Sequence, residues 1–217
     1  MGIISKSIQQ KLKDSHIKKI TNYICEMSNK IVSDYQANSQ KLPNDENAIR
    51  TILLEEYIDI DENKSANKMR GFRFDAEVQE HYVGNGKYAG RVDIRIILKT
   101  DFEKDEACYI VECKRIDGSN DLNKKYVEEG VARFVNRKYS TYYGKNLMLG
   151  FIVKAINIQF NANAIESIQN AMADSSMHGN LVRVNTSGCT TEYKCLYKLL
   201  NEDIELGHIF SDFSSIM

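Results

Sequence analysis

The sequence lacks a long apolar segment. No run approaches the ~20 consecutive apolar residues that a membrane-spanning helix requires, and the first residues, MGIISKSIQQKLKD, lack the apolar centre of a signal peptide. We therefore expect a cytoplasmic protein.

The cysteines lack the spacing of a zinc site or a disulfide framework. There are five, an odd number, and none belongs to a C-x-x-C pair. We therefore expect buried free thiols in a reducing compartment, at Cys25, Cys108, Cys113, Cys189 and Cys195.

Several common catalytic motifs are also missing. The chain has no P-loop, no G-x-G-x-x-G fingerprint, no H-E-x-x-H motif and no nucleophile elbow. Lysine and arginine total 29 against 30 aspartates and glutamates, and the formal net charge of −1 argues against a wholly basic coat for nucleic acid. A basic groove on one face is still compatible with this balance.

The length suits one globular domain with an appended helical segment. Apolar residues from Ile17 to Ile31 recur at steps of three and four, which predicts a helix over residues 1–40 with a basic beginning. That beginning fits a contact with a DNA backbone or, alternatively, a solvated helix face. Pro43, the only proline, marks a restart, so we divide the chain into an N-terminal helical segment, 1–40, and an α/β domain, 41–217.

The stretch from Gly90 to Arg115, GRVDIRIILKTDFEKDEACYIVECKR, predicts two apolar strands joined by a charged turn. Each strand carries one carboxylate, Asp93 or Glu112, where a buried sheet favours none. Because side chains alternate faces along a strand, Glu112 and Lys114 project to the same side. If Asp93 pairs near Glu112, two carboxylates and an ammonium converge, and such a pair favours a hard cation, Mg²⁺ or Mn²⁺.

An aspartate followed by Glu-x-Lys on the next strand resembles the PD-(D/E)xK nuclease superfamily, which includes many restriction endonucleases. Val92 stands where the motif has its proline. The resemblance implies a metal-dependent nuclease that hydrolyses phosphodiester bonds, foremost a DNA endonuclease in a restriction or phage-defence setting. It makes Asp93, Glu112 and Lys114 catalytic, and it makes Asp93, Glu112 and the carbonyl of Cys113 ligands of Mg²⁺ or Mn²⁺.

A helix is predicted after Pro43, capped by Asn44 or Asp45. In proteins that this sequence resembles, a glutamate on the helix before the sheet often completes the metal site, and Glu46 is the matching position. The alternative is an acid that interacts only with the dipole of the first helical turn.

The rest of the pattern predicts the order of elements. We expect a loop at 61–70, strands at 71–83 and 147–156, a helix at 122–140, and a helix capped by Asn161 or Asn163. Short strands follow, and the tail packs back as an edge element. The order α-β-β-β-α-β predicts an α/β fold with a mixed central sheet and flanking helices. The superfamily named above has the same order, so the resemblance implies a restriction-endonuclease-like core.

Positive charge is in local excess between residues 111 and 145, with eight lysines and arginines against five acids. We expect a nucleic-acid-binding surface there, formed by Lys124, Lys125, Arg133, Arg137 and Lys138. For Arg133 the alternative is an ion pair with Glu129, one helical turn earlier.

The partner implied is nucleic acid, foremost DNA, and a homodimer would supply the two active sites that double-strand cutting needs. Two other functions remain open. One is a catalytically silent nucleic-acid-binding or assembly module of the same fold. The other is a regulatory protein that acts on a partner through its N-terminal helix.

Overall fold

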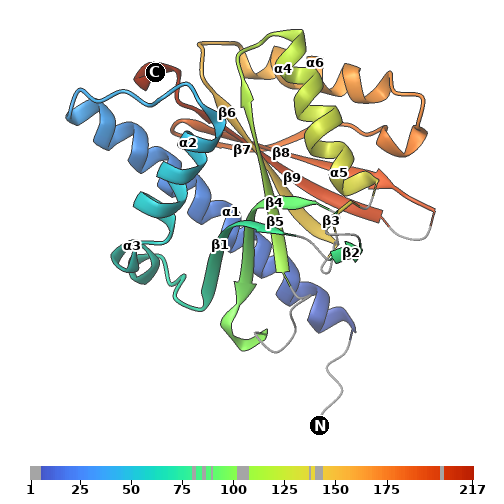
Figure 1. The fold of residues 1–217 in the computed structure, drawn as a ribbon, viewed down its shortest axis with the longest axis horizontal. Coiled ribbons are helices and arrows are strands. Elements are labelled where there is room, and N and C mark those ends of the chain that lie inside the picture. Colours follow the sequence, from blue (N-terminus) through green and yellow to red (C-terminus); the bar gives the residue numbers. More distant parts are fainter. Residues whose placement is uncertain are drawn as a thin grey trace.

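The computed structural model describes residues 6–79, 82–84, 87–88, 90–101, 108–136, 138–139, 144–200 and 203–217. In this part of the chain a seven-stranded mixed sheet forms the centre, and helices flank it (Figure 1). The α/β class, the mixed sheet and the flanking helices that the order of elements predicts are confirmed.

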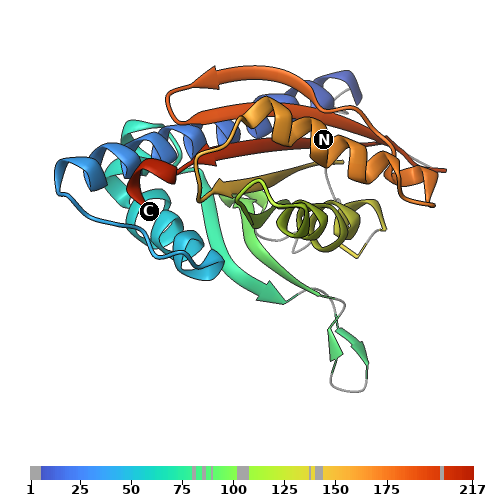
Figure 2. The same cartoon turned by 90° about the horizontal axis from the view of Figure 1, so that it is seen from above.

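The strands of the sheet lie in the order β1-β4-β5-β6-β9-β8-β7. Neighbours pair antiparallel except β5 with β6 and β6 with β9, which are parallel. A small second sheet, β2 with β3, projects from the body of the molecule (Figure 2). The bounds are β1 Phe72–Gln79, β2 Tyr82–Gly84, β3 Lys87–Tyr88, β4 Arg91–Leu98, β5 Cys108–Ile116, β6 Lys145–Ile152, β7 Val182–Ser187, β8 Thr190–Lys198 and β9 Asp203–Asp212.

The helices divide between the two faces of the sheet. The long α1 (Lys6–Ala37) and α2 (Glu46–Thr51), which continues into the π-helix η1 (Ile52–Ile58), pack on one face. On the other face lie α4 (Asn120–Tyr126), the π-helix η3 (Val127–Val131), α5 (Ala132–Val135) and α6 (Ile158–Asn170). The remaining short helices are α3 (Asp61–Ala66), η2 (Lys99–Asp101), η4 (Ser175–Met177) and η5 (Ser214–Ile216). Among the described residues no helix has both the length and the apolar character to cross a membrane.

Each face of the sheet has its own hydrophobic core. The predicted stripe of α1 is buried from Ile20 to Ile31, and it packs against one core together with Leu53 of η1. The other core contains Tyr126 and Phe134 from the α4–α5 layer. Full burial of such a side chain contributes about 1.5–3 kcal/mol, so these stripes hold the helices on the sheet.

The described residues contain no disulfide. Cys25, Cys108, Cys113 and Cys195 are buried and Cys189 is half-buried. Burial raises the pKa of the Cys25 and Cys189 thiols to about 12, which keeps both protonated near neutral pH.

Three local predictions are wrong. The segment 61–70 contains the short helix α3, which buries no side chain and therefore leaves no apolar period in the sequence. Helix α6 begins earlier than predicted, because Asn157 caps it by accepting the N–H of Phe160 at 3.0 Å. The tail forms β9, which lies inside the sheet between β6 and β8 rather than at an edge. Its pairing partners are distant in sequence, so no local pattern indicates them.

The turn between β7 and β8, which contains Gly188, packs against α1. The φ of Gly188 is +58°, a conformation that favours glycine, and an added Cβ would collide with the Asn29 side chain of α1. Asn29 accepts the N–H of Cys189 at 2.7 Å and donates to the carbonyl of Ser187 at 3.2 Å. The turn therefore depends on a close approach that only glycine permits.

We expect Gly188→Ala to lower the free energy of unfolding by about 2–3 kcal/mol, the sum of backbone strain and a disrupted Asn29 contact. Gly144→Ala is the matched control, because Gly144 also has a positive φ, +68°, but no atom of the described residues, apart from its chain neighbours, lies within 4 Å of its added Cβ. Urea unfolding of both variants measures the difference. Equal losses would mean that the Asn29 contact contributes nothing.

Candidate active site

Three carboxylates lie level with one another on three neighbouring strands. In the pairing of β1 with β4, Glu77 falls opposite Asp93. The pairing of β4 with β5, continued by one residue, places Asp93 opposite Glu112. Asp93 is close enough for its charge to act on Glu112, and Arg50 contacts both Asp93 and Glu77. The two predicted carboxylates are therefore brought together, and Glu77 is added to them.

The backbone ladder between β4 and β5 ends at this level. Its last pair is Ile94 with Val111, and beyond it the Asp93 side chain accepts the N–H of Cys113 at 2.7 Å. A side chain has thus replaced a backbone hydrogen bond. Groups from the helices of both faces meet at this interruption of the sheet.

Lys114 is buried among oxygen atoms. Its Nζ donates to Glu112 Oε1 at 2.9 Å, to the carbonyl of Cys113 at 2.8 Å and to Glu46 Oε1 at 3.2 Å. Burial alone would lower the pKa of Lys114, but the carboxylates of Glu112 and Glu46 outweigh it and raise the pKa. The ammonium is therefore charged across the physiological range.

Glu46 reaches the site from the first turn of α2. The side chain of Asp45 caps this helix by accepting the N–H of Ala48 at 2.9 Å. One carboxylate oxygen of Glu46 accepts from Lys114, and the other accepts the N–H of Arg115 at 2.9 Å. Both oxygens thus contact β5 at the level of the Glu-x-Lys motif.

Glu112 is fully buried and both of its oxygens have partners. Arg133 of α5 donates to Oε1 at 2.6 Å, and the hydroxyl of Tyr139 lies 2.7 Å from Oε2. Burial and the nearby charge of Asp93 raise the pKa of Glu112 to about 7, against the opposing effect of Lys114 and Arg133. The spacing of Glu129 and Arg133 in the sequence allows an ion pair between them. The ion pair that the structure shows for Arg133 is with Glu112 instead.

Arg50 is the residue that the sequence does not reveal. It lies on α2 with only 3% of its surface exposed, and it donates to Asp93 Oδ1 at 2.9 Å and to Glu77 Oε1. Glu77 has a φ of +49°, unusual for a residue other than glycine, and its other carboxylate oxygen pairs with Arg91. The guanidinium of Arg50, on α2, thus balances the charge of Asp93.

The expected nucleic-acid-binding surface is only partly assembled at the site. Lys124 and Lys125 are exposed on α4, and Lys138 is exposed next to Gly90. Arg133 instead faces inward to Glu112, and Arg137 lies outside the described residues.

The atoms around the Lys114 ammonium are the donors that a hard cation prefers. Two carboxylate oxygens and one backbone carbonyl lie within 3.2 Å of Nζ, and the Asp93 carboxylate lies level with them. This donor set already binds a cationic group, so its chemistry fits Mg²⁺ or Mn²⁺. Within the described residues no three histidine, cysteine or acidic side chains gather as a metal-binding group.

Comparison of the chain with protein-family models, with curated proteins and with solved structures gave no match.

Protonation of Glu112 makes stability depend on pH. Its pKa is 4.5 in an unfolded chain and about 7 when buried, so between these values the folded protein holds a proton that the unfolded chain releases. The free energy of unfolding therefore falls as the pH rises from 4.5 to 7, by up to about 1.4 kcal/mol per pH unit.

Glu112→Gln removes this titration. Urea unfolding measures the free energy of unfolding of wild type minus that of Glu112→Gln. We expect this difference to fall between pH 5 and pH 7 and to change little above pH 8. A difference that rises between pH 5 and pH 7 would contradict the raised pKa.

Proposed function

We propose that this chain is a metal-dependent nuclease that hydrolyses phosphodiester bonds, with DNA as the foremost substrate. One observation carries the proposal: Asp93 from β4 converges with Glu112 and Lys114 from β5 at a buried interruption of the sheet. Two acids and a lysine in this arrangement are the groups that phosphodiester hydrolysis uses.

The topology supports the same proposal. An antiparallel meander of β1, β4 and β5 leads through α4–α5 into β6, which is parallel to β5. This agrees with the order expected of a restriction-endonuclease-like core. We place the protein in the cytoplasm, in a restriction or phage-defence setting, and a homodimer would provide two sites for cutting both strands.

The proposed metal ligands are Asp93, Glu112, Glu46 and the carbonyl of Cys113. When bound, Mg²⁺ or Mn²⁺ polarises a phosphoryl oxygen and lowers the pKa of a water molecule. Lys114 orients the attacking water or stabilises the negative charge that develops on the phosphoryl group. Arg133 and Tyr139 hold the Glu112 carboxylate in a fixed orientation, because each contacts a different oxygen of it.

The test is cleavage of supercoiled plasmid, single-stranded DNA and RNA, each with Mg²⁺, with Mn²⁺ or with EDTA. We expect cutting of DNA that either metal supports and that EDTA abolishes. A protein that binds these nucleic acids but cuts none of them under any condition would instead be the silent binding module.

A further inference from the structure

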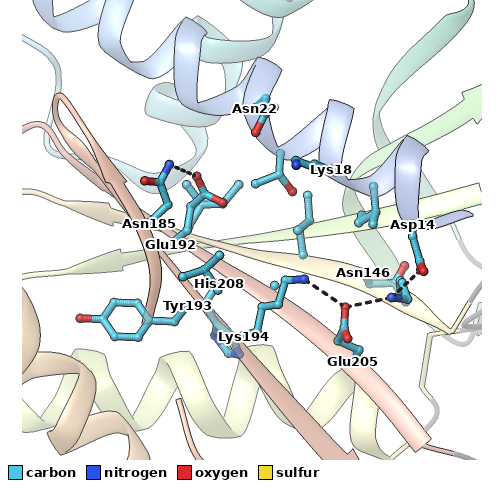
Figure 3. Close-up of a pocket in the computed structure, with 17 residues that line it drawn as sticks. Asp14, Lys18, Asn22, Asn146, Asn185, Glu192, Tyr193, Lys194, Glu205 and His208 are labelled. Carbon is cyan, nitrogen blue, oxygen red and sulfur yellow. Dashed lines mark hydrogen bonds and ion pairs between the residues drawn. The ribbon is translucent and has the colours of Figure 1, made fainter. Parts of the chain in front are cut away.

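A cavity of about 470 Å³ lies between α1 and the sheet, and the candidate active site contributes no residue to it (Figure 3). The first half of α1 forms one wall of the cavity. Residues 10–19 of this helix are not buried, and its buried stripe begins at Ile20. Strands β6, β7, β8 and β9 form the other wall. The size is within the range of small-molecule sites.

Four of the charged groups in this cavity neutralise one another in a chain. Asp14 pairs with Lys145 at 2.6 Å, Lys145 with Glu205 at 3.1 Å, and Glu205 with Lys194 at 3.7 Å (Figure 3). Two acids and two lysines therefore contribute no net charge toward a ligand.

Two further charges face the cavity from opposite walls. Lys18, on α1, has no hydrogen-bond or ion-pair partner among the described residues. Glu192, on β8, accepts through Oε1 from Asn185 at 3.3 Å and from the thiol of Cys25 at 3.8 Å, while its Oε2 has no partner in the same part of the chain. Among the described residues that line the cavity, a ligand therefore meets the ammonium of Lys18 and the carboxylate oxygen Oε2 of Glu192 without a protein partner (Figure 3).

The remaining lining combines an apolar floor with amides. Half-buried Ile17 and exposed Val184 provide apolar contact for a flat ring, and Asn22 offers both a donor and an acceptor, while Asn185 still has its side-chain oxygen as an acceptor. Such amides match the edge of a nucleobase.

We propose that this cavity binds a nucleoside monophosphate. Its phosphate pairs with Lys18, its base lies on the apolar floor, and an exocyclic amine of the base donates to Glu192. This site is separate from the proposed nuclease site, and its occupation does not depend on cleavage.

Isothermal titration of the full chain with AMP, CMP, GMP and UMP tests the proposal. We expect one saturable site, with UMP binding at least fivefold more weakly than the others because uracil has no exocyclic amine. Adenosine, which has no phosphate, is expected to bind at least tenfold more weakly than AMP.

Variants assign the contacts. Lys18→Gln is expected to weaken AMP binding at least fivefold, and Glu192→Ala to abolish the preference over UMP. Lys30→Gln, an exposed lysine of α1 outside the cavity, is the matched control and should bind AMP as wild type does. The proposal is overturned if no nucleotide binds saturably at millimolar concentration, or if Lys18→Gln and Lys30→Gln bind AMP equally well.

Discussion

Replacing Lys114 by alanine is expected to reduce metal-dependent cleavage about 100- to 1000-fold, the usual cost of removing one preorganised charge from an active site. The ammonium of Lys114 is buried within 3.2 Å of Glu112, Glu46 and the carbonyl of Cys113, which are proposed metal ligands, so its charge lies beside the proposed metal site. Initial rates of plasmid nicking with Mg²⁺ measure the effect.

Lys198→Ala is the matched control for Lys114→Ala, because Lys198 is an exposed lysine on β8, near the far edge of the sheet. We expect it to cut as fast as wild type. Circular dichroism establishes that both variants are folded. If folded Lys114→Ala cuts within threefold of wild type, Lys114 has no part in the chemistry.

Replacing Arg50 by methionine is expected to lower the free energy of unfolding by about 3–5 kcal/mol, the cost of breaking a buried ion pair from one side. Asp93 would be left at the interruption of the sheet without its guanidinium partner, and Glu77 would lose a second contact. Urea unfolding at pH 8 measures the loss.

Two further variants separate charge from packing. Arg183→Met, at an exposed arginine on β7, should change the free energy of unfolding little. Adding Glu77→Gln to Arg50→Met should recover part of the loss, since it removes one of the two acids that Arg50 contacts. An Arg50→Met variant as stable as Arg183→Met would show that Arg50 does not balance the acids.

The centre of the candidate site could be predicted because its signal is local. Alternation along β5 places Glu112 and Lys114 on one side, and an acid inside an apolar strand identifies both Glu112 and Asp93. Helix periodicity and the cap at Asp45 likewise indicate α2, and with it the position of Glu46. Each of these inferences needs only neighbouring residues.

The supporting residues could not be predicted, because their roles arise from pairing between distant segments. Glu77 occupies a polar position of an alternating strand, where the sequence indicates a solvated side chain. Its place beside Asp93 follows from the β1–β4 register and from a positive φ. Arg50 becomes a partner of the acids only once α2 packs on the sheet, and Tyr139 only once the segment after α5 does. The cavity under α1 depends on β9, whose central place also has no local signal.

The most direct test of the proposed nuclease site is plasmid cleavage by wild type and by Asp93→Asn, assayed in parallel at increasing Mn²⁺ concentration. Asparagine keeps the size of the side chain but loses the charge of a proposed metal ligand. We predict a saturating rise in rate for wild type and no cleavage by Asp93→Asn at any Mn²⁺ concentration. Cleavage by Asp93→Asn at the wild-type rate would contradict the proposed site.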